Sequence, residues 1–377
     1  MTALPLVAAR GDRYEVGLAH GSQARDLVHG TLEWSLEQLR VGSVDRDEAR
    51  ARVEQLLPYI ESGFPDLLEE CRGIADGAGL PLMDVLVINT RYELLFLTGS
   101  SAPRPGVAGA ECSLIGVTGH RSETGTPIVA QNVDLGPESR SLWIALDAAP
   151  EGATRVLTVT MAGMLAQEGL NAEGLGLCGS MVRSRDWGAG LPTRKFLRRK
   201  VLEQRGVAAA IDVIRSAPKR ASSHNLLLAD RDSVVDVETT ASKVYVTRPA
   251  GGTIVHTNHY IHRDAEAENE GLGRYLANSS ARRDCLVGRL ASLPHRLGTE
   301  AIKSLLSDHS GGGDAVCRHA SRDAYGAETN VSVIVEPALR RIHVALGPPC
   351  ESTFCILELP MDPAAPIKQL HSGGMSA

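Results

Sequence analysis

The pattern of apolar and polar positions divides the chain into a helical first quarter and a remainder that is mostly β. Over residues 14–40 the apolar positions recur about every 3.6 residues, which predicts an amphipathic helix with one buried face. Ser43 and Asp45 are suitable N-caps for a second helix, and Pro58 should bend or end that helix. Another helix is expected at 66–77, followed by an apolar stretch at 82–97.

From Ser113 onward, short apolar runs alternate with segments rich in Gly, Thr and Ser, as is typical of antiparallel strands. The expected strands are 113–117, 127–132, 142–146, 156–161, 175–181, 225–228, 234–238, 244–247, 253–256, 331–335, 342–346 and 354–359. Helices should interrupt them at about 192–216, 279–293 and 299–307. Strands and helices in separate blocks predict an α+β protein with antiparallel sheets packed in layers. The residues after Met361 are expected to form a frayed tail.

Composition narrows the class of protein. With 43% hydrophobic and 22% charged residues, the chain is expected to be globular and soluble. It has 39 basic and 45 acidic residues, a formal charge of −6, and no basic cluster of the kind that binds nucleic acid. No apolar run approaches the roughly 18 residues that would span a bilayer. We therefore expect neither nucleic acid nor a membrane among the partners.

The seven cysteines are odd in number and include no C-x-x-C pair. This argues against a disulfide framework and against a cysteine-ligated zinc site. The opening residues have no basic leader before their short apolar stretch, so we expect no secretory signal. Together these features predict a cytoplasmic protein. The segment Leu197–Arg205 (LRRKVLEQR) is expected to be a solvated helical face.

Cys112 differs from the other cysteines in its position. The segment 100–109 (SSAPRPGVAG) predicts an exposed loop, and it leads directly into Glu111, Cys112 and the first predicted strand. Free cysteines are usually small buried hydrophobes, which is the alternative interpretation. If the Glu111–Cys112 bond were cut, Cys112 would gain an α-amine with a pKa near 8, which is able to serve as base for its own thiol.

Polar residues close two of the expected strands and form a turn that leads into a third. They form the motifs QNVD (131–134), GLNAEGLG (169–176) and HTNH (256–259). Each motif alone is also explained by turn chemistry. The two histidines of HTNH have H-x-x-H spacing, but strand geometry places residues i and i+3 on opposite faces and no third ligand is near, so no metal is expected.

Taken together, the motifs resemble the acyl-coenzyme A:6-aminopenicillanic acid acyltransferases, the isopenicillin N acyltransferase-like peptidases of the N-terminal nucleophile hydrolase superfamily. The matching segments are YEVGLAHG (14–21), CRGIADGAG (71–79), INTR (88–91), ECS (111–113), AQNVD (130–134), GLNAEGLGL (169–177), VHTNH (255–259), VCRH (316–319) and VALGPP (344–349). The resemblance implies a four-layer αββα sandwich of two antiparallel sheets, preceded by an N-terminal helical segment. It also implies a precursor that cuts itself at Glu111–Cys112 into chains 1–111 and 112–377.

The same resemblance assigns roles to individual residues. Cys112 matches the nucleophile, Asp134 the aspartate beside the new amino terminus, and Asn258 the amide that polarises the substrate carbonyl. An amide donor aimed at an oxyanion contributes about 3–4 kcal/mol to catalysis. The remaining correspondences suggest contacts with substrate at Ser113, Asn132, Ser180, Thr240 and His319.

Three departures from the family pattern affect these expectations. Glu111 replaces a glycine, which bears on the rate of self-cleavage, and Val133 replaces an aromatic residue next to Asp134. The family's serine-arginine pair falls at Tyr325-Gly326, so a guanidinium is missing unless Arg318 or Arg322 replaces it. A penicillin substrate is therefore not assumed.

The sequence thus predicts a self-processing cysteine amidohydrolase or acyltransferase that acts on the amide or thioester of a small acylated metabolite. No resident cofactor is expected, although a coenzyme A thioester remains open as the acyl donor, as do higher oligomers. Two alternatives remain. One is an uncleaved, non-catalytic sandwich that serves as a binding module, and the other is an uncleaved thiol hydrolase with His259 or His319 as base.

Overall fold

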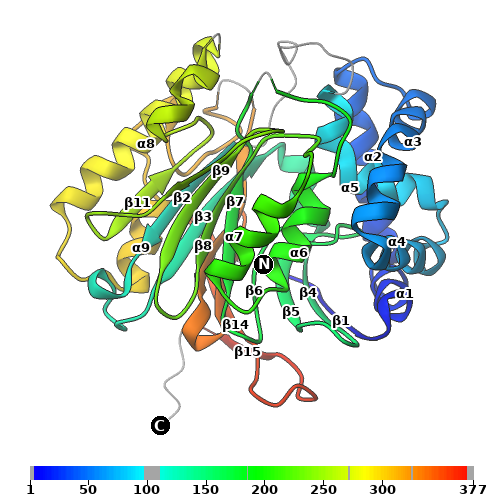
Figure 1. Cartoon of the computed structure of the whole chain (residues 1–377). Helices are drawn as coiled ribbons and strands as arrows, with labels where there is room; N and C mark the ends of the chain where they lie inside the picture. Colours follow the sequence, from blue (N-terminus) through cyan, green and yellow to red (C-terminus); the bar gives the residue numbers. More distant parts are fainter. Residues whose placement is uncertain (1–3, 97–110, 185, 271, 324–325, 372–377) are drawn as a thin grey trace.

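Two β-sheets lie face to face between layers of helices in the computed structural model, which describes residues 4–96, 111–184, 186–270, 272–323 and 326–371 (Figure 1). The α+β class and the αββα sandwich predicted from the sequence are confirmed. The predicted loop at 100–109 lies outside the described residues. None of the helices in the described ranges is both long and apolar enough to cross a bilayer.

The first sheet has eight strands within the described residues. In spatial order they are β1 (Leu6–Gly11), β4 (Trp143–Pro150), β5 (Val156–Met161), β6 (Glu168–Asn171), β7 (Gly176–Ser180), β8 (His224–Ala229), β9 (Val234–Thr239) and β10 (Val244–Thr247). Neighbouring strands are antiparallel except β1 and β4, which run parallel. The expectation of purely antiparallel sheets is therefore wrong at this edge, because the N-terminal segment supplies a strand as well as helices.

The second sheet, described with seven strands, is antiparallel throughout. Its strands are β11 (Thr253–His256), β2 (Glu111–Val117), β3 (Ile128–Leu135), β12 (Glu328–Glu336), β13 (Arg341–Leu346), β14 (Cys355–Glu358) and β15 (Lys368–His371). The prediction of a frayed tail after Met361 is partly wrong, because residues 368–371 pair with β14. Pairing satisfies backbone groups that a frayed tail would leave to solvent.

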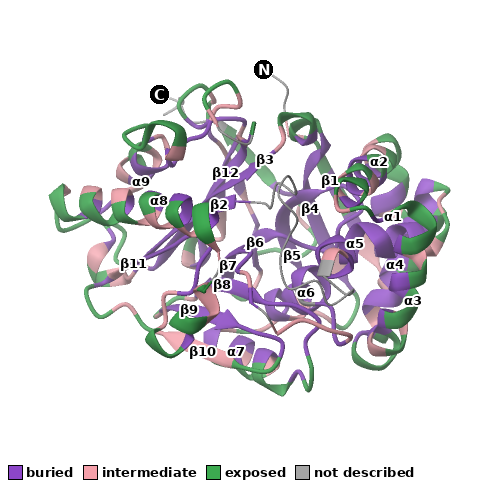
Figure 2. Ribbon diagram, turned by 90° about the horizontal axis from the view of Figure 1, so that it is seen from above, coloured by how far each residue is buried: buried purple, intermediate pink, exposed green. Residues whose placement is uncertain are grey.

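Helices cover the outer face of each sheet. The first sheet contacts α1 (Arg13–Gln23), α2 (Arg25–Val41), α6 (Arg198–Leu202) and α7 (Val207–Ser216). Behind these lie α3 (Arg46–Gly63), α4 (Pro65–Ala78) and α5 (Leu82–Phe96). On the second sheet lie α8 (Gly273–Ser292) and α9 (Thr299–Leu306), which bury an apolar cluster against β2 and β3. Seen from above, the sheets are buried and the exposed residues line the outer helices (Figure 2).

The N-terminal helices differ from the sequence prediction in two places. The helix expected over 14–40 is two helices, with Ala24 between them. Asp45 caps α3 as expected, but the helix continues through Pro58 to Gly63 instead of ending there. Pro58 costs one backbone hydrogen bond, whereas Leu56 and Ile60 on either side of it are fully buried in the core. Packing of these neighbours explains why the helix is kept.

Glycines explain two of the sequence motifs, because they allow α1 and α4 to approach closely. A Cβ at Gly17 would fall 2.0 Å from the carbonyl oxygen of Glu70, and one at Gly73 would fall 2.0 Å from that of Tyr14. Any larger side chain at either position would force the backbones apart. The glycines of YEVGLAHG and CRGIADGAG therefore serve packing between helices.

Candidate active site

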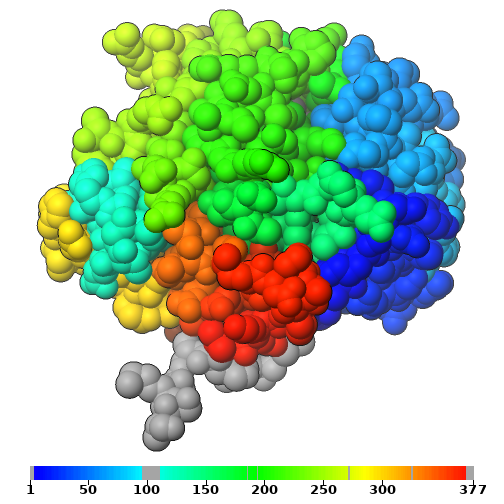
Figure 3. Space-filling view, turned by 60° about the horizontal axis from the view of Figure 1, so that its bottom comes forward, coloured from blue at the N-terminus to red at the C-terminus, as the bar shows by residue number. Residues whose placement is uncertain are grey.

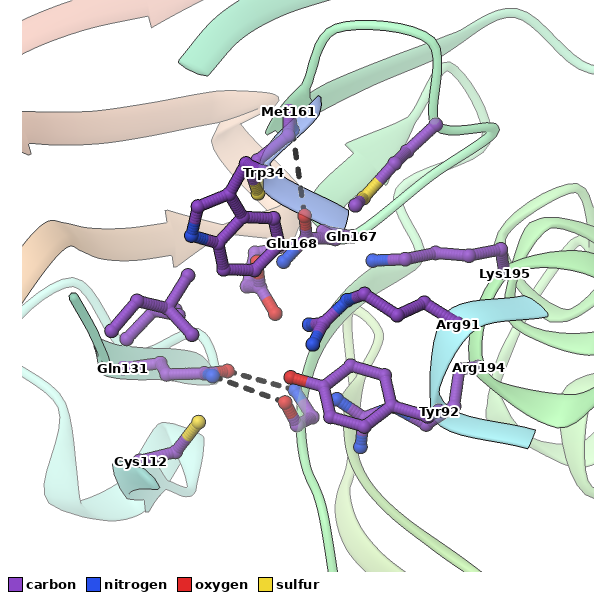
Figure 4. Close-up of a pocket in the computed structure, with 14 residues that line it drawn as sticks. Trp34, Arg91, Tyr92, Cys112, Gln131, Met161, Gln167, Glu168, Arg194 and Lys195 are labelled. Carbon is purple, nitrogen blue, oxygen red and sulfur yellow. Dashed lines mark hydrogen bonds between the residues drawn. The ribbon is translucent and has the colours of Figure 1, made fainter. Parts of the chain in front are cut away.

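Cys112 lies at the start of β2, between the two sheets. It pairs with Val133 of β3 and, by strand alternation, its side chain points to the same face as Gln131, Val133 and Leu135. That face forms one wall of a small cavity in which Cys112 is 1% exposed. Trp34, Arg91, Tyr92, Arg194 and Lys195 from the helical layer form the opposite wall (Figure 4).

Gln131 joins the two sheets at the base of this cavity. Its Nε2 donates to the carbonyl oxygen of Gly179 at 3.0 Å, and the Gly179 N–H donates back to Oε1 at 2.8 Å. A Cβ at Gly179 would lie 2.6 Å from Arg198, so only glycine leaves room for this exchange. The pair fixes the distance between β3 and β7 beside the thiol.

Asn258 and Arg282 hold the backbone of Cys112. The Cys112 N–H donates to Asn258 Oδ1 at 2.8 Å, and Arg282 donates to the Cys112 carbonyl oxygen. Arg282 also donates to Asn258 Oδ1 at 2.9 Å and to Ser113 Oγ at 3.0 Å. Asn258 follows β11, which pairs with β2, and Arg282 lies fully buried on α8. The peptide group before Cys112 is therefore held by Asn258 and the one after it by Arg282, from two elements that lie far away in the sequence.

Asp134 lies on the other face of β3, opposite Glu111. Its Oδ1 accepts a hydrogen bond of 2.7 Å from Thr329 Oγ1, while its buried Oδ2 has no partner within the described residues. Burial raises the pKa of this carboxyl to about 7, although Arg282 and the Thr329 bond act to lower it. Asp134 can thus change its charge close to neutral pH.

Glu111 is buried and paired with positive charge. Arg318 forms an ion pair with its carboxylate, and Arg282 Nη2 lies 3.7 Å from Oε2. Arg318 also pairs with Asp323. Of the two arginines considered as substitutes for the missing guanidinium, Arg318 is the one that the structure brings to the Glu111–Cys112 bond.

The Cys112 thiol has no histidine beside it. Burial, followed by the negative charges of Asp134 and Glu168, raises its pKa to about 12. Among the described residues, no histidine lines the cavity or bonds to this sulfur. His259 instead contacts Ser279 Oγ at 2.7 Å, and burial lowers its pKa to about 4. In the uncut chain the thiol is therefore protonated at neutral pH.

The cavity wall opposite Cys112 carries an excess of positive charge. It contains Arg91, Arg194 and Lys195 but only one carboxylate, Glu168, which is paired with Arg198 at 3.0 Å. Arg91 stacks on the rings of Trp34 and Tyr92, and in the described structure neither Arg91 nor Lys195 has a carboxylate within ion-pair distance. Burial lowers the pKa of Lys195 well below its usual value. An anionic group entering this cavity would be stabilised.

The residues given weaker roles by the resemblance lie in different settings. Ser113 contacts Arg282, as described above. Asn132 points toward α9 and donates to the carbonyl oxygens of Leu306 and Val316. Ser180 Oγ donates to the Thr257 carbonyl at 2.6 Å between the sheets.

Two of these residues lie away from Cys112. Thr240 bonds to Asp186 in a turn after β9, and His319 belongs to a surface cluster with Cys317 and Cys350. Neither lines the cavity that contains the thiol.

Sequence reasoning missed the buried cations. Arg198 and Arg199, expected on a solvated face, are instead fully buried and paired with Glu168 and Glu70, so that prediction is wrong. Arg282 was also missed, because its partners at the site, Asn258 and Cys112, lie 24 and 170 residues away along the chain. The only available signal was a charged residue on an otherwise buried helical stripe, which α8 shows at Arg282.

The facing sheets, with their outer helices and the cysteine at the start of an inner strand, define the class as the N-terminal nucleophile hydrolase fold. The family model for acyl-coenzyme A:6-aminopenicillanic acid acyl-transferase matches residues 121–351, and the chain belongs to this family. The 40 kDa form of acyl-coenzyme A:6-aminopenicillanic-acid-acyltransferase from Emericella nidulans is 24% identical over 350 residues, which cover 91% of this chain and 92% of that protein.

Two solved structures show a distant likeness. An N-acylethanolamine-hydrolyzing acid amidase ortholog from Caenorhabditis elegans is 17% identical, with a TM-score of 0.45, over 60% of this chain and 94% of that one. Penicillin V acylase from Agrobacterium tumefaciens is 13% identical, with a TM-score of 0.48, over 70% of this chain and 92% of that one.

Proposed function

We propose that this chain is a self-processing cysteine amidohydrolase or acyltransferase whose nucleophile is Cys112. One observation carries the proposal: Asn258 and Arg282 hydrogen-bond to the peptide groups on both sides of Cys112, while its side chain faces a small cavity lined by basic residues. A cysteine that served only as core filling would not require a buried arginine and a buried amide directed at its peptide groups.

Self-cleavage would precede turnover. The Cys112 sulfur adds to the Glu111 carbonyl carbon, the C–N bond breaks, and the nitrogen takes the thiol proton to become the new α-amine. Water then hydrolyses the resulting thioester, which releases the thiol and leaves Glu111 with a terminal carboxylate. Asp134 lies across the strand pair from Glu111, where its charge would favour the ammonium that forms.

In turnover the freed α-amine would act as the base that the cavity otherwise lacks. It takes the thiol proton as sulfur attacks the substrate carbonyl, and then gives it to the leaving amine or thiol. Asn258 would donate to the tetrahedral oxyanion. Water or a second amine resolves the thioester on Cys112, which gives hydrolysis or acyl transfer. A coenzyme A thioester would fit the same steps as acyl donor.

The charge of the cavity supports a substrate that carries a negative group on its acyl part. Arg91 and Lys195 extend into the cavity that Cys112 also lines, and the Lys195 tip lies near Gln167 (Figure 4). A carboxylate placed there would offset the cost of burying the Arg91 cation and would favour the charged form of Lys195.

A matched pair of chromogenic amides tests the proposal. Succinyl p-nitroanilide carries a carboxylate, and butyryl p-nitroanilide is its neutral counterpart. We expect wild type to cleave the succinyl compound faster, Cys112→Ala to cleave neither, and Lys195→Met to lose the preference. Cleavage of both compounds by Cys112→Ala would contradict the nucleophile, whereas a wild-type preference for the butyryl compound would contradict only the charge of the substrate.

A further inference from the structure

Four potential metal ligands from three segments converge at the surface beyond α9. His309 follows α9, Cys317 and His319 precede β12, and Cys350 lies in the turn after β13. One nitrogen or sulfur atom from each residue lies within 4.8 Å of all the others. None of the four residues lines the Cys112 cavity.

The spacing of these atoms matches a tetrahedral zinc ion. With Zn–S bonds of about 2.3 Å and Zn–N bonds of about 2.0–2.1 Å, the edges of the tetrahedron are about 3.8 Å for S–S, 3.3 Å for N–N and 3.6 Å for S–N. The Cys317 and Cys350 sulfurs lie 3.6 Å apart, and Nε2 of His309 and Nε2 of His319 lie 3.1 Å apart. His319 Nε2 lies 3.3 Å from Cys350 Sγ and 3.9 Å from Cys317 Sγ.

The surroundings of the cluster also suit a metal ion. Glu351 Oε1 lies 3.6 Å from His319 Nδ1, so a small movement of this exposed carboxylate would let it accept from Nδ1–H and leave Nε2 free to bind. Cys317 is buried, whereas His309 and Cys350 are exposed, so an ion can enter from solvent. Two thiols with two imidazoles are the donor set that zinc prefers.

We propose that His309, Cys317, His319 and Cys350 bind one Zn²⁺ as a structural site. All four positions of the tetrahedron come from the protein, which leaves none for catalysis. The sequence had suggested no metal, because the ligands span 42 residues and include no C-x-x-C pair. The fold brings the ligands together, which the spacing along the chain does not reveal.

A bound zinc ion would also stabilise one short loop that reaches the active site. Arg318 lies between the two ligands Cys317 and His319 and forms the ion pair with Glu111. Fixing both neighbours of Arg318 would hold its guanidinium against the residue that precedes Cys112.

Zinc content measured on the Cys112→Ala chain tests the site separately from the proposed function, because binding does not need self-cleavage. The protein is incubated with ZnCl₂ under reducing conditions, desalted and analysed by mass spectrometry of the metal. We expect one zinc ion per chain in wild type and in Cys112→Ala, and almost none in Cys317→Ser or His319→Ala. Matched controls outside the cluster are Cys355→Ser and His295→Ala, which should keep the ion.

Cobalt gives a second readout that does not depend on how well a variant folds. Co²⁺ bound to wild type should give the visible absorption of a tetrahedral thiolate site, and equimolar Zn²⁺ should abolish it. Wild type that stays free of zinc, with its thiols reduced, would overturn the proposal. So would a Cys317–Cys350 disulfide in the purified chain, because it removes both sulfur ligands.

Discussion

At the scale of single residues, Asn258 makes hydrogen bonds through both the oxygen and the nitrogen of its side-chain amide. Its Oδ1 accepts from the Cys112 N–H and from Arg282, and its Nδ2 donates to the Met181 carbonyl at 3.0 Å. The first contact holds the cleavage site, whereas the amide nitrogen is the part that would serve an oxyanion. A substitution that keeps the oxygen and removes the nitrogen separates the two.

The substitution Asn258→Asp separates the two roles, because it keeps the side-chain oxygen and removes the amide nitrogen. We expect the variant to fold, because an oxygen still meets Cys112 N–H and Arg282, but to lose about 100-fold or more in turnover. Turnover of an amide reporter by the purified, correctly cut variant is the measurement. A variant with wild-type turnover would show that Asn258 does not serve the oxyanion.

Asp134 should give self-cleavage a pH dependence near neutrality. Its pKa is raised to about 7 by burial, so the carboxyl is mostly neutral below pH 7 and mostly charged above it. If the charge favours the forming ammonium, the rate of self-cleavage rises as pH increases through about 7 and levels off above. Asp134→Asn should cut more slowly and lack this inflection, as followed by gel after a pH jump. If the rate of self-cleavage in Asp134→Asn kept the inflection near pH 7, the inflection would belong to another titrating group.

The family resemblance selected the candidate residues Cys112, Asp134 and Asn258, and their places at predicted strand ends agreed with it. Cys112, Asp134 and Asn258 each begin, lie in or follow a strand of the same sheet, and the structure brings them together. Arg282 and Lys195 come from helices whose position relative to that sheet is set by tertiary packing. No periodic pattern in the sequence encodes that position.

At the scale of elements, α8 places the buried guanidinium of Arg282 against the start of β2. Arg282 Nε donates to Asn278 Oδ1 at 3.0 Å, one turn earlier on the same helix. This bond orients the guanidinium toward Cys112. A guanidinium carries five N–H donors spread over three nitrogens in a fixed plane, whereas a lysine ammonium has three donors on a single nitrogen and cannot span the same acceptors.

Arg282→Lys should therefore keep the charge but slow self-cleavage by about 10-fold or more, since an interaction present only with the planar fork is lost. Arg283→Lys, at the next and partly exposed position of α8, is the matched control and should cut at the wild-type rate. The fraction of uncut chain over time gives the comparison. Equal rates of self-cleavage in the two variants would show that Arg282 contributes to packing only.

Strand prediction succeeded for most of the described strands, including the four-residue edge strands β10 and β11, and failed for three short ones. The long central strands β2, β3 and β12 were predicted close to their observed positions. The sequence prediction missed β1, β6 and β15, of four to six residues. Such strands depend on their neighbour for stability, and their own sequence contributes little signal.

At the scale of the whole molecule, the segment before Cys112 is part of the sandwich. Its strand β1 pairs with β4 along six residues, and its helices bury apolar faces against the first sheet. The N-terminal and C-terminal segments also meet on one face of the molecule, where Leu4 and Gln369 line the same groove (Figure 3). Self-cleavage would cut the chain without separating these layers.

The two pieces 1–111 and 112–377 should therefore stay together after cleavage. We expect them to co-elute as one species in size-exclusion chromatography, and to separate only in denaturant, because separation would expose the sheet edge and the apolar helix faces. The uncut Cys112→Ala chain should elute at the same position. Elution of two smaller species under native conditions would contradict this description of the fold.

Self-cleavage at Glu111–Cys112 is the central claim, and the intact mass of the purified protein tests it most directly. Wild type should give two masses that correspond to residues 1–111 and 112–377, and the larger piece should begin Cys-Ser-Leu-Ile on amino-terminal sequencing. Cys112→Ala should give a single mass for all 377 residues. Wild type that remains one chain after prolonged incubation at neutral pH, or a cut at any other bond, would contradict the account.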